Sequence, residues 1–429
     1  MTCRRLKKYI RMQLASQKIL TFSEFVHSSN HILAEAASHL VHVEDQVLYG
    51  GVEGAKAAIQ TLRTVRNSLA GKGAGTSVTV KWDGAPAIFC GIDPTDGKFF
   101  VAKKSIFNKV PEVYKTPQDI DRNIEPGDLN NKMKVALNEF SKLGIKGIIQ
   151  GDLLFTYDTL KHEKIQGQRY ITFHPNTIVY AVPAESPEAK AILAARIGVV
   201  FHTTYSGKLG ALHASPGVDT KSFKRIPSVW WRTADLKGIG TETVSSAADL
   251  SRVDSILKEA EATFKSIPSS ILKALQSNPD LAQTIETFAN SKVRAGKEIG
   301  DPQKHATELV AWMNARFDQE AASKKTEKGK AAVDARRQAT FDFFSRENLP
   351  NIVKAFKLQA QLVQAKKELI GQLNRLGGVS TFLKTKAGFE PTSQEGYIAG
   401  TKAGIVKLVD RLGFSRANFS PDVQKGWQR

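Results

Sequence analysis

Apolar and polar residues alternate along residues 78–83, and this pattern predicts a half-buried strand. Gly84 and Pro86 interrupt the alternation, and the apolar residues at 88–89 begin a second strand. Lys81 therefore lies near the end of a strand, beside a glycine turn that lets a ligand approach the backbone closely. This position makes Lys81 the first candidate for chemistry in the chain.

Strand-like patterns continue to about residue 240, and the character of the chain then changes. Further strands are predicted at 99–105, 148–155 and 177–182, with one helix at 131–143. The residues after 245 are rich in Ala, Lys, Glu, Gln and Leu at helical spacing, which predicts an all-α segment with apolar core stripes. The expected fold class is α+β, in four segments: an N-terminal basic helical region (1–70), the first part of a strand-rich core (71–244), an α-helical insertion (245–386) and the final part of the core (387–429).

Composition restricts the classes of partner. The 429 residues carry a formal net charge of +19, which favours phosphate-rich partners such as nucleic acid, although a solvated basic surface would give the same count. No apolar run approaches the roughly 20 residues needed to span a bilayer, so no membrane partner is expected. Cys3 and Cys90 are the only cysteines, which leaves no disulfide framework or Cys-based zinc site and favours a reducing cytoplasm.

Two basic segments and an early group of histidines leave alternatives open. Residues 1–22 are strongly basic and contain no acid, so they could be a nucleic-acid-contacting arm, a targeting sequence or a leader before an alternative start. Residues 322–337 are either a solvated helix face or a nucleic-acid contact. Histidine pairs at helical spacing within residues 27–42 could hold zinc, but a polar helix interface is favoured because the sequence places no third ligand.

The strand containing Lys81 ends in a short sequence with a known counterpart. Lys81, Asp83 and Gly84 form the pattern Lys-x-Asp-Gly, which resembles motif I of the covalent nucleotidyltransferases: ATP-dependent DNA and RNA ligases and capping enzymes. The resemblance implies that Lys81 attacks the α-phosphate of ATP and forms a lysyl-AMP. Taken alone, these residues would equally fit a surface hairpin turn.

Segments that follow resemble later motifs of the same superfamily, in the same order. Lys103 and Lys104 are similar to the basic segment that follows motif I in RNA ligases. Asp152, in the sequence IIQGDLLF, is similar to the motif III acid that contacts the ribose. Tyr180, in TIVYAV, resembles the aromatic residue that stacks on the base. His174 and His202, which flank this strand in the sequence, are further candidates for lining the same pocket.

The last two motifs lie near the end of the chain. Glu395-Gly396 is similar to motif IV, and Lys407, followed by Arg411, is similar to motif V. The resemblance implies a ligase-type nucleotidyltransferase core of antiparallel sheets, interrupted by the large all-α insertion. It also implies nucleotide-binding roles for these residues and for Gly84.

The implied chemistry suits these residue types. A lysine amine attacks phosphorus only when it is unprotonated, and cations such as Lys103, Lys104 and Lys407 near Lys81 would favour that form. The same cations would neutralise charge on the α-phosphate as pyrophosphate leaves. Mg²⁺ prefers oxygen ligands, and Glu395 could hold it directly or through water.

Two aspartates complete the expected site. Asp152 is an acceptor when ionised and therefore suits a ribose hydroxyl. Asp83 lies two residues from Lys81 on the same strand face and could orient it.

The chain also departs from the motifs in ways that bear on function. Ala85 and Pro86 stand where ligases usually carry Ser or Thr and, in DNA ligases, Arg. Motif V usually contains two lysines, and here only Lys407 is present. The chain ends at Arg429, which leaves no room after motif V for a C-terminal OB domain.

These observations favour a polynucleotide ligase using ATP and Mg²⁺ on nucleic-acid ends, RNA rather than DNA. The wider pattern resembles a family of uncharacterised bacteriophage proteins, which implies the host cytoplasm as its location. One alternative is a ligase-like nucleic-acid- or nucleotide-binding protein without complete catalysis, in a structural or accessory role. Another is an adenylyltransferase that modifies a protein or a small molecule.

Overall fold

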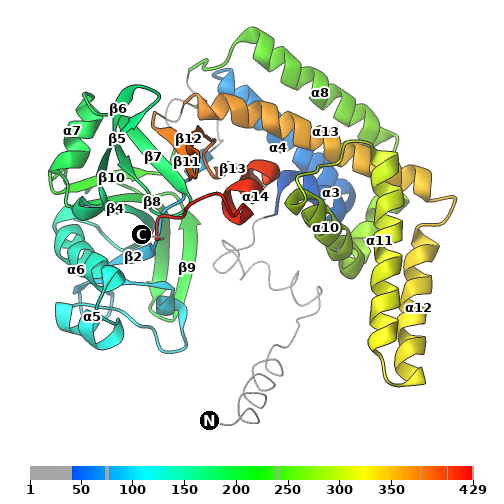
Figure 1. Ribbon diagram of the computed structural model, residues 1–429, viewed down its shortest axis with the longest axis horizontal. Helices are drawn as coiled ribbons and strands as arrows, with labels where there is room; N and C mark the ends of the chain where they lie inside the picture. Colours follow the sequence, from blue (N-terminus) through cyan, green and yellow to red (C-terminus); the bar gives the residue numbers. More distant parts are fainter. Residues whose placement is uncertain are drawn as a thin grey trace. The chain divides into compact units, whose positions relative to one another are not determined.

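The computed structural model describes residues 41–72, 77–236, 239–240, 242–376, 378–402 and 404–427. These residues form three sheets, antiparallel except for one strand pair, and a group of helices (Figure 1). The expected α+β class is therefore confirmed. The basic N-terminal segment and the histidines before His42 lie outside the described residues.

Sheet I carries the first candidate motif and contains segments from both ends of the chain. Its strands, in spatial order, are β1 (Ser77–Lys81), β13 (Gly396–Thr401) and β14 (Gly404–Leu408). One face, with alternate residues such as Val80 and Tyr397, is buried against helices. Because side chains alternate across a strand, Lys81 and Lys407 both lie on the opposite face.

Sheet II lies beside sheet I and carries the expected ribose-binding strand. Its strands are ordered β10 (Val229–Thr233), β8 (Ile197–Lys208), β4 (Ile148–Thr156), β2 (Ala87–Ile92) and β3 (Phe99–Ala102), with β9 (Ala211–Pro216) also paired to β8. The residues after β10 join the two sheets, because Ala234 accepts a hydrogen bond from Val80 N (2.8 Å) and donates one to Phe201 O (2.9 Å). One face of sheet II packs on α5 (Pro117–Asn123) and α6 (Asp128–Phe140).

Sheet III completes the strand-rich part. Its strands are ordered β12 (Gly388–Pro391), β11 (Ser380–Thr385), β7 (Ile178–Pro183), β6 (Gln168–Phe173) and β5 (Lys161–Ile165). Helix α7 (Pro187–Ala194) follows β7 and begins with a Ser186 side chain that accepts a hydrogen bond from Ala189 N. The helix expected at 131–143 is confirmed as α6 and the short 3-10 turn after it.

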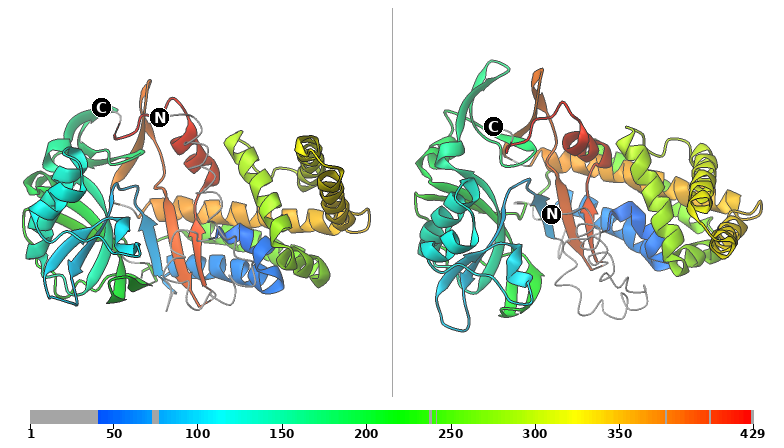
Figure 2. Two further views of the ribbon diagram at one scale, coloured as in Figure 1. Left: turned by 90° about the horizontal axis from the view of Figure 1, so that it is seen from below. Right: turned by 60° about the horizontal axis from the view of Figure 1, so that its bottom comes forward.

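The helices form one continuous core with the buried face of sheet I. They are α3 (Gln46–Tyr49), α4 (Gly51–Leu69), α8 (Ala247–Lys265), α9 (Ser269–Ser277), α10 (Pro279–Arg294), α11 (Pro302–Ser323), α12 (Glu327–Phe343) and α13 (Leu349–Asn374). The short helix α14 (Arg411–Phe419) lies outside this core: it packs on α10 and contributes Ala417 to a separate small cluster. Figure 2 shows the strands of sheet I side by side, next to α4 and α13. Since α4 packs on both α8 and α13, the N-terminal helix and the insertion share one hydrophobic core.

The described residues all belong to one compact unit, which holds α4 together with the helices of the expected insertion. One expected boundary needs a correction. The all-α segment ends with α13 at Asn374, and residues 380–385 form β11, which pairs with β7. The helical spacing of the preceding residues hid this short strand, whose alternation covers only six positions.

Candidate active site

Lys81 and Glu395 form an ion pair at one edge of sheet I, where β1 ends and β13 begins. The Lys81 Nζ donates to Glu395 Oε1, although the two residues are 314 positions apart in sequence. The pairing of β1 with β13 brings them together, because Lys81 lies opposite Gly396, the residue after Glu395. The Lys81 side chain is 37% exposed and that of Glu395 is 12% exposed, so solvent reaches the lysine more easily than the glutamate.

Burial and neighbouring charges act on Glu395 in opposite directions. Desolvation raises the pKa of Glu395, and the negative charges of Asp83 and Asp152 act in the same direction. The positive charge of Lys81 lowers it, but the net shift is upward. Three acidic residues that the sequence separates widely therefore share one electrostatic environment with Lys81.

Lys407 lies on the same face of the sheet as Lys81. It is opposite Ile398 in the pairing of β13 with β14, two positions along from the residue that faces Lys81. Burial lowers the pKa of Lys407, and the positive charges of Lys81 and Arg411 lower it further. The expected convergence of the motif V lysine on Lys81 and Glu395 is thus present in the structure.

The Asp83 side chain stabilises the turn after β1 through hydrogen bonds. Its carboxylate accepts hydrogen bonds from Asn176 Nδ2 (2.6 Å), Thr177 N (2.6 Å) and Ile178 N (2.7 Å). These bonds tie the turn to the beginning of β7, and the side chain is buried. Asp83 therefore positions Lys81 through the backbone, in place of the direct orientation of the amine that the sequence suggested.

Tyr180 lies in the core, which corrects its expected role. Its ring packs between Trp82 (centroids 4.9 Å apart) and Phe173 (5.4 Å), and the residue has no exposed surface. Its hydroxyl accepts a hydrogen bond from Asp83 N at 2.7 Å. Because protein covers the ring, Tyr180 supports the motif I turn and does not stack on a base.

Gly84 and Asp152 are in close contact. A methyl group at Gly84 would lie 2.6 Å from the Cβ of Asp152 and 2.9 Å from the carbonyl oxygen of Leu153. Hydrogen bonds from Ala85 N to Leu153 O (2.9 Å) and from Leu153 N to Pro86 O (3.1 Å) hold the two segments together. Only glycine fits this approach, and it places Asp152 directly beside the Lys81 turn.

His202 is the aromatic ring that the structure places beside Asp152. Its Nε2 lies 3.4 Å from Asp152 Oδ2, and both side chains are about one quarter exposed. The pairing of β4 with β8 brings them together at an irregularity where Gly151 faces Phe201. The sequence offered His202 only as a flanking candidate, since the signal for its position is the register between strands.

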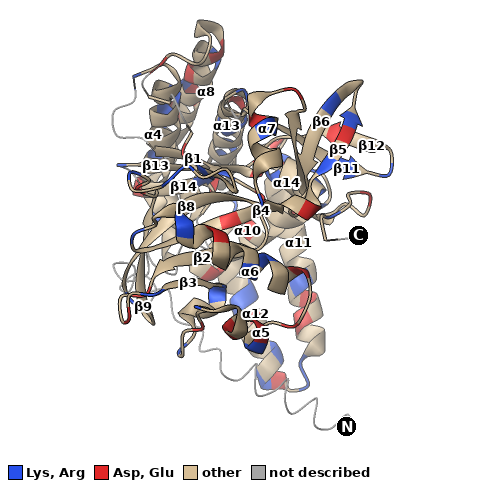
Figure 3. Ribbon diagram, turned by 90° about the vertical axis from the view of Figure 1, so that its left-hand side faces the viewer, with Lys and Arg blue, Asp and Glu red and all other residues tan. Residues whose placement is uncertain are grey.

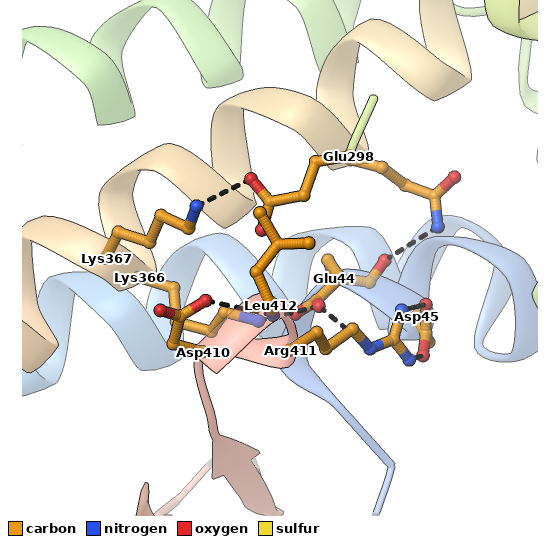
Figure 4. Close-up of polar contacts among 9 residues, drawn as sticks. Glu44, Asp45, Glu298, Lys366, Lys367, Asp410, Arg411 and Leu412 are labelled. Carbon is orange, nitrogen blue, oxygen red and sulfur yellow. Dashed lines mark hydrogen bonds and ion pairs between the residues drawn. The ribbon is translucent and has the colours of Figure 1, made fainter. Parts of the chain in front are cut away.

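Arg411 is held in a buried cluster of charges, which corrects its expected role as a nucleotide ligand. Its guanidinium pairs with the Asp45 carboxylate, and its Nε lies 3.6 Å from Glu44 Oε1 (Figure 4). Lys366 Nζ contacts the same Glu44 oxygen at 2.6 Å. The cluster anchors the N-terminus of α14, directly after β14, to α13 and to the residues before α3.

The two lysines after β3 lie at the same end of sheet II as Asp152. Ala102, the residue before Lys103, pairs with Phe89, and Ala87 pairs with Asp152. Lys104 is exposed and Lys103 is half-buried. Their expected contribution to phosphate binding stays a prediction.

A cavity of about 220 Å³ adjoins the ion pair. Its walls include Asp83, Glu395, Thr177 and the half-exposed ring of Phe414. Polar and apolar groups thus meet beside Glu395, the partner of Lys81, as in many small-molecule sites.

The donor set near Lys81 fits a cation bound together with substrate phosphates. Among the described residues, no group of three or more His, Cys, Asp or Glu side chains is arranged to hold a metal. Mg²⁺ commonly uses one or two carboxylates and completes its shell with phosphates and water, and Glu395 can supply such a ligand.

The structure thus defines a lysine–carboxylate site at the junction of two sheets. The family model of DUF6267, described as a family of unknown function, matches residues 37–423, and the chain belongs to this family. No curated protein and no solved structure matches the chain. In the part of the chain that the structure describes, no helix has the length and apolar character needed to cross a membrane.

Proposed function

We propose that this protein is an ATP-dependent nucleotidyltransferase that forms a lysyl-AMP on Lys81 and passes the AMP to a polynucleotide end, RNA rather than DNA. The observation that carries the proposal is the convergence of Lys81, Asp152, Glu395 and Lys407 from four segments of the chain. The order of these segments along the chain resembles the order of ligase motifs.

In the first step, the neutral Nζ of Lys81 attacks the α-phosphorus of ATP. A phosphorus–nitrogen bond forms, the bond from the α-phosphorus to the bridging oxygen breaks, and pyrophosphate leaves. Glu395 contacts the amine and has a pKa raised by burial, so it is placed to accept the lysine proton. In the alternative, where another group takes the proton, the ionised Glu395 carboxylate would hold Mg²⁺, which supplies charge neutralisation on the phosphates when bound.

Other residues would bind the nucleotide. Lys407 carries positive charge on the same face as Lys81 and suits the negative phosphates. Asp152 can accept hydrogen bonds from ribose hydroxyls, and His202 offers a partly exposed ring against which a base could pack. In the later steps, a 5′-phosphate would take the AMP, and a 3′-hydroxyl would displace it.

The second candidate is a nucleotide- or nucleic-acid-binding protein with a ligase-like core and incomplete catalysis. It is favoured by the engagement of Arg411 in the buried charge cluster, which removes one expected phosphate ligand. Ala85 and Pro86, which depart from the motif pattern, favour it as well.

Incubation with α-³²P-labelled ATP and Mg²⁺ separates these candidates. We expect covalent label on the wild-type protein and none on Lys81→Arg, which keeps the charge but removes the nucleophile. Glu395→Gln should label much more slowly, whereas Lys328→Gln, on the exposed surface of α12, should match the wild type. A wild-type protein that binds ATP without any covalent label would favour the binding protein.

A further inference from the structure

Sheet II presents one face that is not covered by α5 and α6. Phe89, Gln150 and Tyr205 lie on this face, and Gln150 is two positions along β4 from Asp152. The Tyr205 hydroxyl donates to Gln150 Oε1 at 2.7 Å. This face therefore continues from the candidate active site toward the edge of the sheet.

An exposed aromatic ring lies over this face. Phe107, at the end of the 3-10 turn Lys104–Phe107, has its ring centroid 5.1 Å from that of Phe89 and 5.5 Å from that of Tyr205. Phe107 is nevertheless 44% exposed, and nearby Val110 is 80% exposed. A ring fixed from below and open to solvent above is a platform on which another flat group can stack.

Basic residues lie in the loop that carries the ring and in the turn next to this loop. Lys104 and Lys109 come from the same loop, and Lys208 ends β8 at the turn into β9. This turn lies against the loop, because a methyl group at Gly210 would be 3.5 Å from Cγ of Pro111. All three lysines are exposed, and none of their side chains forms an ion pair or hydrogen bond with another of the described residues.

The basic run around α12 is different, although it has more positive residues in sequence. Figure 3 shows acidic and basic residues interspersed along α11 and α12. Arg336 Nη2 lies 2.6 Å from Glu320 Oε1, and Arg337 Nη1 lies 2.8 Å from Asp318 Oδ1. These ion pairs satisfy the cations within the protein, so the run offers less unpaired charge than its sequence suggests.

We propose that Phe107, Lys104, Lys109 and Lys208 form a docking surface for a single-stranded nucleic acid, the acceptor strand of the proposed reaction. Exposed aromatic rings bind unpaired bases by stacking, and lysines bind the phosphates between them. A duplex keeps its bases stacked inside and cannot use the ring in this way. The inference rests on the proposed function for its account of why the strand leads toward Asp152 and Lys81.

Fluorescence anisotropy with a 5′-fluorescein-labelled oligouridylate of 12 nucleotides tests the surface, with a blunt RNA duplex as second probe. The triple variant K104Q/K109Q/K208Q should weaken oligouridylate binding about tenfold and reduce the log–log salt slope by about 2, for three lost phosphate contacts on a single strand. Phe107→Ala should weaken binding about tenfold without changing the slope, and Phe107→Tyr should restore it.

The matched control is K258Q/K273Q/K328Q, which removes the same charge from exposed positions on the helices. It should retain nearly all of the wild-type affinity for oligouridylate. Equal losses in the two triple variants, or unchanged binding in Phe107→Ala with an unaltered melting temperature, would overturn the proposal. A wild-type protein that binds the RNA duplex more tightly than the oligouridylate would also overturn it. The same holds if the wild-type protein does not bind the oligouridylate measurably.

Self-adenylylation with ATP and Mg²⁺ is measured on Phe107→Ala and on the double variant K109Q/K208Q. We expect it to be unchanged, since none of these three residues belongs to the candidate nucleotide site. Strand binding that depends on Phe107 in a wild-type protein without any adenylylation would support this surface and contradict the proposed function. Adenylylation without strand binding that depends on Phe107 would support the proposed function and contradict this surface.

Discussion

Replacing Lys366 by alanine should destabilise the protein strongly, because it leaves a buried glutamate without its main partner. Lys366 Nζ and Glu44 Oε1 are 2.6 Å apart, and their side chains are 1% and 2% exposed. Breaking a buried ion pair by removing one partner typically costs about 3–5 kcal/mol. Arg411 Nε remains 3.6 Å from the same oxygen, so we expect the lower end, about 3 kcal/mol.

The pH dependence of unfolding gives a second estimate of the same interaction. Burial raises the pKa of Glu44, but Lys366 and Arg411 outweigh it and lower the pKa from 4.5 to about 2. A carboxylate with a lowered pKa stabilises the fold above its unfolded value, and the contribution is lost as the pH falls. The loss should occur between about pH 4.5 and pH 2 and amount to about 3 kcal/mol.

Urea denaturation of three variants measures these contributions. The double variant E44Q/K366M removes both charges at similar volume and should lie within about 1 kcal/mol of the wild type at pH 7. Lys330→Ala, which disrupts an exposed ion pair with Glu327 on α12, should change the unfolding midpoint very little. The reasoning would be refuted if Lys366→Ala lay within about 1 kcal/mol of the wild type. It would also be refuted if Lys366→Ala and the double variant had the same stability.

Three further substitutions test the candidate site. Gly84→Ala should abolish adenylylation and lower stability, because its methyl group would meet Asp152 at 2.6 Å. The control Gly371→Ala has open space in α13 and should stabilise the protein by about 0.5–1 kcal/mol in urea denaturation. Equal effects of the two substitutions would contradict this interpretation. Tyr180→Phe should cost about 1–3 kcal/mol, because it leaves a buried backbone N–H without an acceptor, and unchanged urea unfolding would exclude that role. His202→Ala should weaken ATP binding several-fold in titration calorimetry with an unaltered melting temperature, and unchanged affinity would remove it from the nucleotide site.

Local sequence patterns predicted the strands of the site well. The alternation around Lys81 and the apolar run containing Asp152 each describe a strand by its own residues, and both strands are present. The meeting of Lys81 with Glu395 depends on pairing between distant strands, which no local pattern contains. It was expected only because the order of the motifs resembles that of a known superfamily.

The roles of individual side chains were harder to predict. An alternating strand does not show whether an aromatic residue faces a ligand or the core, so the burial of Tyr180 between Trp82 and Phe173 could not be read from its position. Arg411 likewise looked free, because its partner Asp45 is 366 positions away in the sequence. Such residues are defined by tertiary partners, and the structure is needed to find them.

The most direct test of the account is to locate the AMP after incubation with ATP and Mg²⁺. Peptide mapping by mass spectrometry, under conditions that preserve an acid-labile phosphoramidate, should place one AMP on the peptide containing Lys81. Fragmentation should assign it to the Lys81 side chain and leave peptides containing Lys103, Lys104 and Lys407 unmodified. An AMP on another residue, or wild-type protein that remains unmodified at saturating ATP across the pH range in which it stays folded, would contradict the account.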